Sequence, residues 1–194
     1  RCFGAGHAWG DTDAGVGFRG TMETALRACL WSRLASRVCL GLARFPAEDP
    51  EQIYEGVRGV DWEEHMSTAS TFCVDASLRG SRMSHSQYVS LKAKDGIVDY
   101  FRERSGSRPS VLKEDPDLRI NLHVRGREAV LSLDLSGSSL HERGYRERAG
   151  LAPIKENLAS AILWRMGWPE IFAAGGDFID PMCGAGTFSI EAGL

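Results

Sequence analysis

The sequence has no long hydrophobic run: no stretch approaches the roughly 18 consecutive apolar residues of a membrane-spanning helix. Cysteine is sparse too, with five scattered along 194 residues and no Cys-x-x-Cys pair. This odd, scattered set indicates neither a zinc site nor a disulfide framework. We therefore expect reduced thiols, no metal, no membrane association and a cytoplasmic location. The chain begins with Arg1 rather than Met, so we expect its natural N-terminus to be missing.

Neither sign of charge dominates, and the net charge of −3 by itself argues against a nucleic-acid binder. The distribution is uneven, however. Residues 79–148 carry 14 basic and 10 acidic side chains, whereas residues 1–78 have a net charge of −4 and residues 149–194 one of −3. A basic middle between acidic flanks predicts an anionic partner for that segment. Ordinary solvated surface charge is the alternative for each arginine taken singly.

Hydrophobic periodicity predicts a mixed α/β fold. Residues 16–60 follow the pattern strand, helix, strand, helix. Thr21 is a candidate N-cap for the first helix, and Asp49-Pro50 is typical of the start of the second. Residues 1–15 are rich in Gly, Asp and Ala and show no period, so we expect them to be disordered.

The clearest pattern lies in residues 118–135. Apolar and polar side chains alternate over 118–124, Gly126 allows a turn, and the alternation returns from Leu131. A hairpin with one buried face is therefore predicted. Before it, a long helix is expected behind a capping box at Ser84–Gln87.

The strongest local motif is Asp180-Pro-Met-Cys-Gly-Ala-Gly-Thr-Phe-Ser-Ile-Glu191. It predicts a short strand ending at Asp180, a glycine turn, and a helix from Thr187. Glycines let the backbone turn tightly and lie close to a ligand, and a helix start attracts polar or anionic groups. No Lys follows the second Gly, and Ser189 stands where a dinucleotide fingerprint needs its third Gly, so both phosphate-loop classes are disfavoured. A plain tight turn is the alternative for the glycines alone.

The whole string resembles the first motif of S-adenosylmethionine-dependent methyltransferases, in the Asp-Pro-x-Cys-Gly-x-Gly-Thr form of enzymes that methylate exocyclic amines of nucleic-acid bases. In that family the strand-end acid and the glycine turn lie against the methionine part of the cofactor. The helix after Pro153 resembles the preceding motif, which borders the same cofactor. The resemblance therefore implies S-adenosyl-L-methionine as cofactor, held by Asp180, Pro181, Cys183, Gly184, Gly186, Thr187, Lys155 and Glu156. Cys183 is expected to pack as a small loop residue, not to act as a nucleophile.

The upstream chain resembles a THUMP domain, an RNA-binding module, in Leu91–Phe101, Pro116–His123 and Leu133–Gly137 with Arg143–Arg146. THUMP followed by Pro-Ile-Lys-Glu and Asp-Pro-Met-Cys-Gly is similar to the bacterial 23S rRNA guanine-N2 methyltransferase family. Leu30–Arg37 resembles that family's ferredoxin-like subdomain. The organisation this predicts is residues 1–15 disordered, 16–68 a partial ferredoxin-like subdomain, 69–148 THUMP, and 149–194 the truncated start of a Rossmann-like methyltransferase domain.

This resemblance implies that the parent protein is an enzyme. Ribosomal RNA (23S, free or in a pre-ribosomal particle) docks on THUMP, and a guanine N2 amine accepts the methyl group after the base leaves its stack. The family's Asn/Asp-Pro-Pro-Tyr-type motif is expected downstream of Leu194. We therefore name no catalytic residue and expect this chain alone to be inactive. The alternatives are a non-catalytic THUMP RNA-binding module and, disfavoured by THUMP, methylation of DNA amines.

The candidate RNA contacts are basic or aromatic side chains in the basic middle, since cations pair with phosphates and an aromatic ring stacks on an unpaired base. They are Lys92 and Lys94 on the long helix, Arg119 on the polar face of the hairpin, and Arg143, Tyr145, Arg146 and Arg148 before Pro153. For the hairpin face, simple solvent exposure is the stronger alternative. Ion pairing with nearby Asp95, Asp99 or Asp134 is a further alternative.

Overall fold

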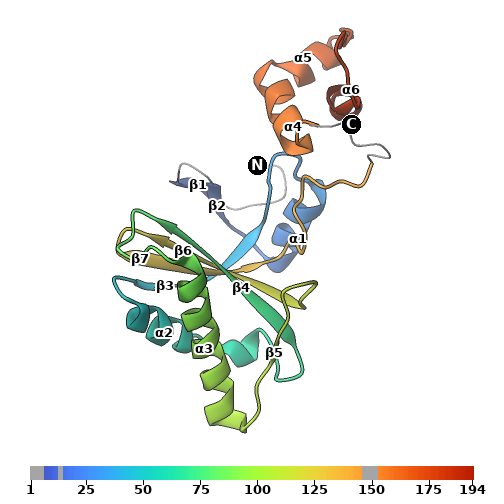
Figure 1. The fold of residues 1–194 in the computed structure, drawn as a ribbon. Coiled ribbons are helices and arrows are strands. Elements are labelled where there is room, and N and C mark those ends of the chain that lie inside the picture. Colours follow the sequence, from blue (N-terminus) through green and yellow to red (C-terminus); the bar gives the residue numbers. More distant parts are fainter. Residues whose placement is uncertain (1–6, 13–14, 146–152) are drawn as a thin grey trace. The chain divides into compact units, whose positions relative to one another are not determined.

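The computed structural model describes residues 7–12, 15–145 and 153–194 (Figure 1). Its contacts divide the chain into two compact units, Arg1–Val38 with Ser138–Leu194, and Cys39–Gly137. The elements of the first unit are β1 (His7–Thr12), β2 (Gly15–Arg19), α1 (Met22–Trp31), α4 (Glu156–Arg165), α5 (Trp168–Ala173) and α6 (Thr187–Gly193). Those of the second unit are β3 (Cys39–Pro46), α2 (Pro50–Arg58), the 3-10 turn η1 (Trp62–Glu64), β4 (Thr71–Arg79), α3 (Ser86–Ser105), β5 (Ser110–Val111), β6 (Leu118–Arg125) and β7 (Glu128–Asp134).

The unit Cys39–Gly137 is built on a five-stranded sheet in the order β3-β7-β6-β4-β5. Strands β6 and β7 form the predicted hairpin, with Leu122 opposite Leu131 and Gly126 at a φ of 62° in the turn. Strand β4 pairs with β6 in parallel, and α3 makes the crossover between them. Helices α2 and α3 cover the same face of the sheet (Figure 1). The mixed α/β fold class is confirmed.

The core lies between this sheet and its two helices. The large, fully buried side chains include Ile53, Trp62, Phe72, Ile97, Phe101, Ile120, Leu122 and Leu131. Trp62 also donates its indole N–H to the Val57 carbonyl at 2.9 Å, which satisfies its polar atom inside the core. Where α3 passes α2, a Cβ added at Gly96 would lie 2.9 Å from the Tyr54 carbonyl oxygen. Close packing of these helices therefore requires glycine at position 96.

Two helix starts are confirmed and a third is wrong. The Asp49 side chain accepts from Gln52 N at 2.9 Å with Pro50 behind it, and Thr21 accepts from Thr24 N at 3.3 Å. The Ser84–Gln87 capping box does not form. Helix α3 begins later, at Ser86, with its first bond from Val89 N to the His85 carbonyl, so Ser84 lies outside the helix.

The predicted boundary at 68/69 differs from the division in the structure. The break falls at 38/39, because β3 pairs with β7 and places Leu40 opposite Leu133 in the same sheet. Helix α2 joins this unit because it packs on the core below that sheet. Residues 7–12, within the segment expected to be disordered, form β1 against β2. Backbone pairing, which the sequence pattern does not reveal, makes this hairpin.

Two expectations for the C-terminal segment are also wrong. Phe178–Asp180 is not a strand, because among the described residues no other strand pairs with it. The apolar period after Pro153 predicts a helix with Ile154, Leu158, Ala161 and Ile162 on its inward face. In α4, however, Leu158 and Ala161 are exposed, and Ala159, Ser160 and Leu163 are buried instead. That face meets α6, so tertiary packing sets it.

Replacing Ile120 by Asp should lower the free energy of unfolding of the unit Cys39–Gly137 by at least ~3 kcal/mol, because a carboxylate would replace a fully buried apolar side chain. Val130→Asp, on the opposite face of the same hairpin, is the matched control and should cost much less. Urea unfolding of both variants measures this. Equal losses would contradict the assigned faces.

Asp117 joins the start of β6 to the start of β4. One of its carboxylate oxygens accepts from Thr71 N at 2.7 Å and from Thr71 Oγ1 at 2.8 Å, which lowers its pKa below the ordinary 3.8. A lowered pKa in the folded state gives stability that is present above the unfolded pKa and lost as the pH falls through the folded one.

Asp117→Asn should therefore reduce the loss of folding stability that occurs as the pH falls. The measurement is the difference in melting temperature between a pH of about 6 and a pH of about 3, where wild type should lose more than the variant. Asp115→Asn, at a neighbouring exposed carboxylate, is the control and should behave as wild type. A variant as acid-sensitive as wild type would show that the Asp117–Thr71 pair contributes nothing.

Candidate functional site

The glycine turn of the motif is an open loop between Phe178 and α6. Asp180 Oδ1 accepts from Met182 N at 3.1 Å, and Gly186 N donates to the Cys183 carbonyl at 2.7 Å. Gly184 and Gly186 have φ of 53° and 74°, left-handed values that favour glycine. A Cβ at Gly186 would meet no atom within 4 Å. A ligand can therefore approach the backbone closely at this turn.

One tryptophan holds both ends of this loop. The Trp168 ring packs on Phe178 with centroids 5.2 Å apart, and its indole N–H donates to the Ala192 carbonyl at 2.8 Å. Residue 178 precedes the loop and residue 192 belongs to the helix after it. Because both flanks are fixed to Trp168, the loop shape is set by α5 and α6.

The predicted cofactor residues differ in exposure. Thr187 and Glu156 are buried, Asp180 and Gly186 are half-buried, and Pro181, Cys183, Gly184 and Lys155 are exposed. Lys155 is the N-cap residue of α4 and Glu156 is its first residue. Because α4 packs against α6, the structure brings the two predicted motifs to neighbouring helices.

Sequence reasoning missed the most connected polar residue of this unit, Glu191 on α6. Its carboxylate, 2% exposed, forms an ion pair with Arg33 and accepts hydrogen bonds from Ser160 on α4 and from Tyr145 Oη at 2.8 Å. These three partners lie in three separate parts of the sequence, all distant from Glu191. A lone Glu at the end of an apolar motif was the only signal available for it.

Two predicted RNA contacts are engaged in these internal contacts. Arg143 donates to the Ser32 carbonyl, and Tyr145 is bound to Glu191. Arg146 and Arg148 lie outside the described residues. Substituting Arg143 would thus disturb the fold as well as any RNA contact.

The other candidates lie on the unit Cys39–Gly137. Lys94 Nζ is 2.7 Å from Asp95 Oδ1, and Lys92 is half-buried on the same helix. Arg119 donates to Asp75 at 2.8 Å, and this hydrogen bond raises the pKa of the Arg119 guanidinium. The ion pairing expected as an alternative thus occurs for Lys94 with Asp95, whereas Arg119 pairs with Asp75, which is not among the expected partners.

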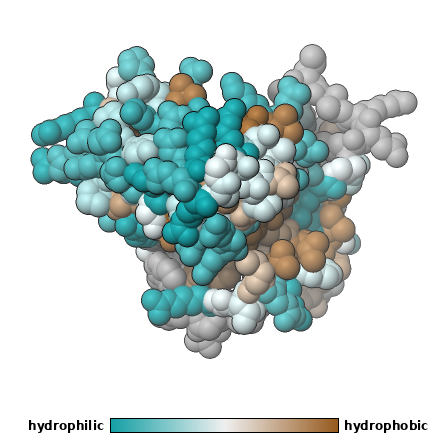
Figure 2. All heavy atoms as spheres, turned by 90° about the horizontal axis from the view of Figure 1, so that it is seen from below, coloured by the Kyte–Doolittle hydropathy of each residue, from teal (hydrophilic) through white to brown (hydrophobic). Residues whose placement is uncertain are grey.

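In the described part of the chain, no group of three or more His, Cys, Asp and Glu side chains is placed to hold a metal ion. Nor is any helix within those ranges long and apolar enough to cross a membrane. Figure 2 shows one face of the molecule on which hydrophilic residues form most of the surface and hydrophobic residues form separate patches.

Comparison with known families agrees with this architecture. Models of the RlmL ferredoxin-like domain, the THUMP domain and the RMKL-like methyltransferase domain match residues 4–39, 47–134 and 143–194. A ribosomal RNA large subunit methyltransferase K/L from Syntrophotalea carbinolica is 58% identical over 95% of this chain. The chain is thus similar to one part of the ribosomal RNA large subunit methyltransferases K/L. It spans about a quarter of that relative, 26% of its length.

Two solved structures share the fold of this chain. A predicted N6-adenine-specific DNA methylase from Listeria monocytogenes is 30% identical with a TM-score of 0.79, covering 92% of this chain and 46% of its own. SMU.472, crystallised in complex with SAH, is 33% identical with a TM-score of 0.78 over the same shares. The family resemblance seen in the sequence is thus confirmed, with S-adenosylmethionine as the family's cofactor.

Glu191→Ala should unfold the segment containing α4 and α6 by removing the shared partner of Arg33, Tyr145 and Ser160. Breaking a buried pair in this way costs about 3–5 kcal/mol, because the remaining charge is left uncompensated. Faster amide hydrogen exchange in peptides from α4 and α6 would show that this segment has unfolded. Glu170→Ala, at an exposed position on α5, is the control. Unchanged protection in the Glu191 variant would mean that this carboxylate does not hold the segment together.

Proposed function

We propose that this chain is the RNA-binding and cofactor-motif portion of an S-adenosylmethionine-dependent methyltransferase acting on the N2 amine of a guanine in 23S rRNA. One observation carries the proposal: the open glycine turn at 180–187 lies in the same chain as a THUMP domain. The glycine turn supports a cofactor that lies against the backbone, and the THUMP domain supports an RNA substrate. A cytoplasmic location follows from that substrate.

The residues of the turn fit the cofactor. Space beside Gly186 is open, and the left-handed backbone there admits glycine without strain. Asp180 and the backbone of Gly184 and Gly186 would hold the methionine part. Thr187 and the start of α4, Lys155 and Glu156, would border it. When bound, the cofactor supplies a methyl group on a positively charged sulfur.

On this proposal the chain's own contribution is binding and positioning. The unit Cys39–Gly137 binds RNA, and the loop fixed by Trp168 orients the cofactor. Holding both reactants lowers the entropic part of the barrier, provided that the amine lies close to the methyl carbon. The base must first leave its stack, which costs a few kcal/mol.

A second function, amine methylation of DNA, is favoured by the description of the Listeria structure as a DNA methylase. THUMP argues for RNA instead, and the nucleic acid that accepts methyl groups decides between the two. A third, a non-catalytic RNA-binding module, predicts RNA binding without any transfer.

The test is tritium transfer from labelled S-adenosylmethionine, followed by nucleoside analysis for N2-methylguanosine. A protein in which this chain is continued by the rest of a K/L methyltransferase should modify 23S rRNA but not DNA. The 194-residue chain assayed alone should transfer nothing, since its described residues 153–194 contain helices and no strand beside the loop.

In the longer protein, Asp180→Asn should weaken cofactor binding about tenfold or more, because an ionised acceptor becomes a neutral amide. Asp177→Asn, three residues upstream and exposed, is the matched control and should bind as wild type. Transfer to DNA, transfer by the short chain, or equal effects of the two substitutions would each contradict part of the proposal.

A further inference from the structure

One end of the sheet in the unit Cys39–Gly137 gathers four arginines. Strands β4 and β6 end at Arg79 and Arg125, which are register partners in the parallel pair. Arg82 follows β4, and Arg127 follows β6. Gly126 N donates to the Arg79 carbonyl at 3.0 Å, which joins the two connections. We call Arg79, Arg82, Arg125 and Arg127 the arginine rim.

Glu48 offsets only part of the charge of Arg82 and Arg127. Glu48 is shared, since one of its carboxylate oxygens lies 3.8 Å from Arg82 Nη1 and the other 3.8 Å from Arg127 Nη1. Both separations exceed the roughly 2.7–2.9 Å of a charge-assisted hydrogen bond. The side chains of Arg82 and Arg127 remain 73% and 70% exposed. Nearby Glu128 is 3.9 Å from Arg44, so Arg82 and Arg127, which share Glu48, together keep an excess of positive charge.

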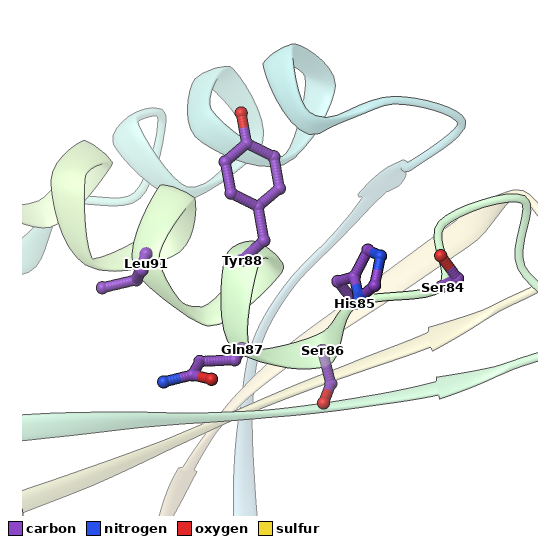
Figure 3. A pocket seen from close by; sticks show the side chains of 6 residues that line it. All are labelled: Ser84, His85, Ser86, Gln87, Tyr88 and Leu91. Atoms are coloured by element: carbon purple, nitrogen blue, oxygen red, sulfur yellow. The ribbon is translucent and has the colours of Figure 1, made fainter.

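A surface hollow of about 380 Å³ begins two residues after Arg82 (Figure 3). It is lined by Ser84, His85, Ser86, Gln87, Tyr88 and Leu91. In Figure 3 the side chains of Ser84, His85 and Tyr88 point the same way, whereas Ser86 points the opposite way and Gln87 extends to the side. Tyr88 is 50% exposed, and no acidic residue lies in the first turn of α3. An exposed aromatic ring therefore lies on the first turn of α3, six residues after Arg82, and that turn carries no carboxylate.

We propose that the rim and the hollow together bind a single-stranded stretch of RNA, with phosphates on the arginines and an unpaired base on the Tyr88 ring. The guanidinium fork matches phosphate oxygens, and an aromatic ring stacks on bases of any sequence. A duplex would offer the phosphates but no free base face, so the ring selects single strand. This inference rests on the proposed function, because it takes RNA as the substrate.

The experiment measures fluorescence anisotropy of the 194-residue chain with a labelled RNA hairpin that carries a single-stranded tail, and with the same hairpin blunt. Wild type should prefer the tailed RNA. The double variant Arg125→Gln with Arg127→Gln should bind it about tenfold more weakly, with the slope of log K against log salt reduced by about 1–2. Tyr88→Leu should lose the preference for the tail and keep the salt slope.

The matched control is Arg102→Gln with Lys113→Gln, which removes the same charge from exposed positions at the other end of the unit, near the end of α3 and after β5. It should keep the affinity and the tail preference. Melting temperatures of all variants verify folding, and Tyr88→Phe, which retains the ring, should restore the preference.

Control and rim variants that weaken binding equally, or a Tyr88→Leu variant that still prefers the tail, would overturn the inference. If the rim variants bind RNA as wild type does while the longer protein still methylates RNA, the arginine rim is not the RNA contact, but the proposed function stands. A wild-type chain that binds the tailed hairpin no better than its DNA counterpart would instead count against the RNA substrate itself.

Discussion

The arrangement of the other strands and of α3 in the unit Cys39–Gly137 depends on strand β6. It pairs in parallel with β4 on one side and antiparallel with β7 on the other, and Ile120, Leu122 and Val124 are buried beneath it. A strand buried on one face must present its alternate residues on the other. The parallel pair also requires a long crossover, which α3 supplies. Because parallel strands end at the same edge, Arg79 and Arg125 become neighbours there.

The other unit is held together by a different principle. Around Glu191 its segments meet through a buried carboxylate with partners at Arg33, Tyr145 and Ser160, and apolar side chains such as Leu158 and Trp164 remain exposed. A buried ion needs several hydrogen bonds to offset its desolvation. Tyr145 supplies one of them, which is why a residue that resembles an RNA contact in the sequence has an internal role in the structure.

The sequence predicted what is local and missed what depends on distant partners. The hairpin at 118–135 and the start at Asp49-Pro50 follow from alternation and capping within a few residues. The buried face of α4 depends on its packing against α6, and the boundary of the first unit depends on the pairing of β3 with β7. Residues 178–180 do not form a strand because no neighbouring strand pairs with them in the described part of the chain. The candidate site divides in the same way. The turn at Gly184 and Gly186 was predicted because its glycines are contiguous, whereas the arginine rim combines residues whose adjacency requires the β4–β6 register.

The insertion of one unit into the other links the two proposed activities. The chain leaves the first unit after Val38 and returns at Ser138, so the unit Cys39–Gly137 is attached at both of its ends to the unit that carries the glycine turn. Two covalent connections restrict relative motion more than one. On the proposed function, RNA bound by the inserted unit and the cofactor loop belong to one chain, so that the encounter of base and cofactor is intramolecular once the RNA is bound. On the proposed function, affinity at the arginine rim raises the local concentration of the target base even though the rim takes no part in the chemistry.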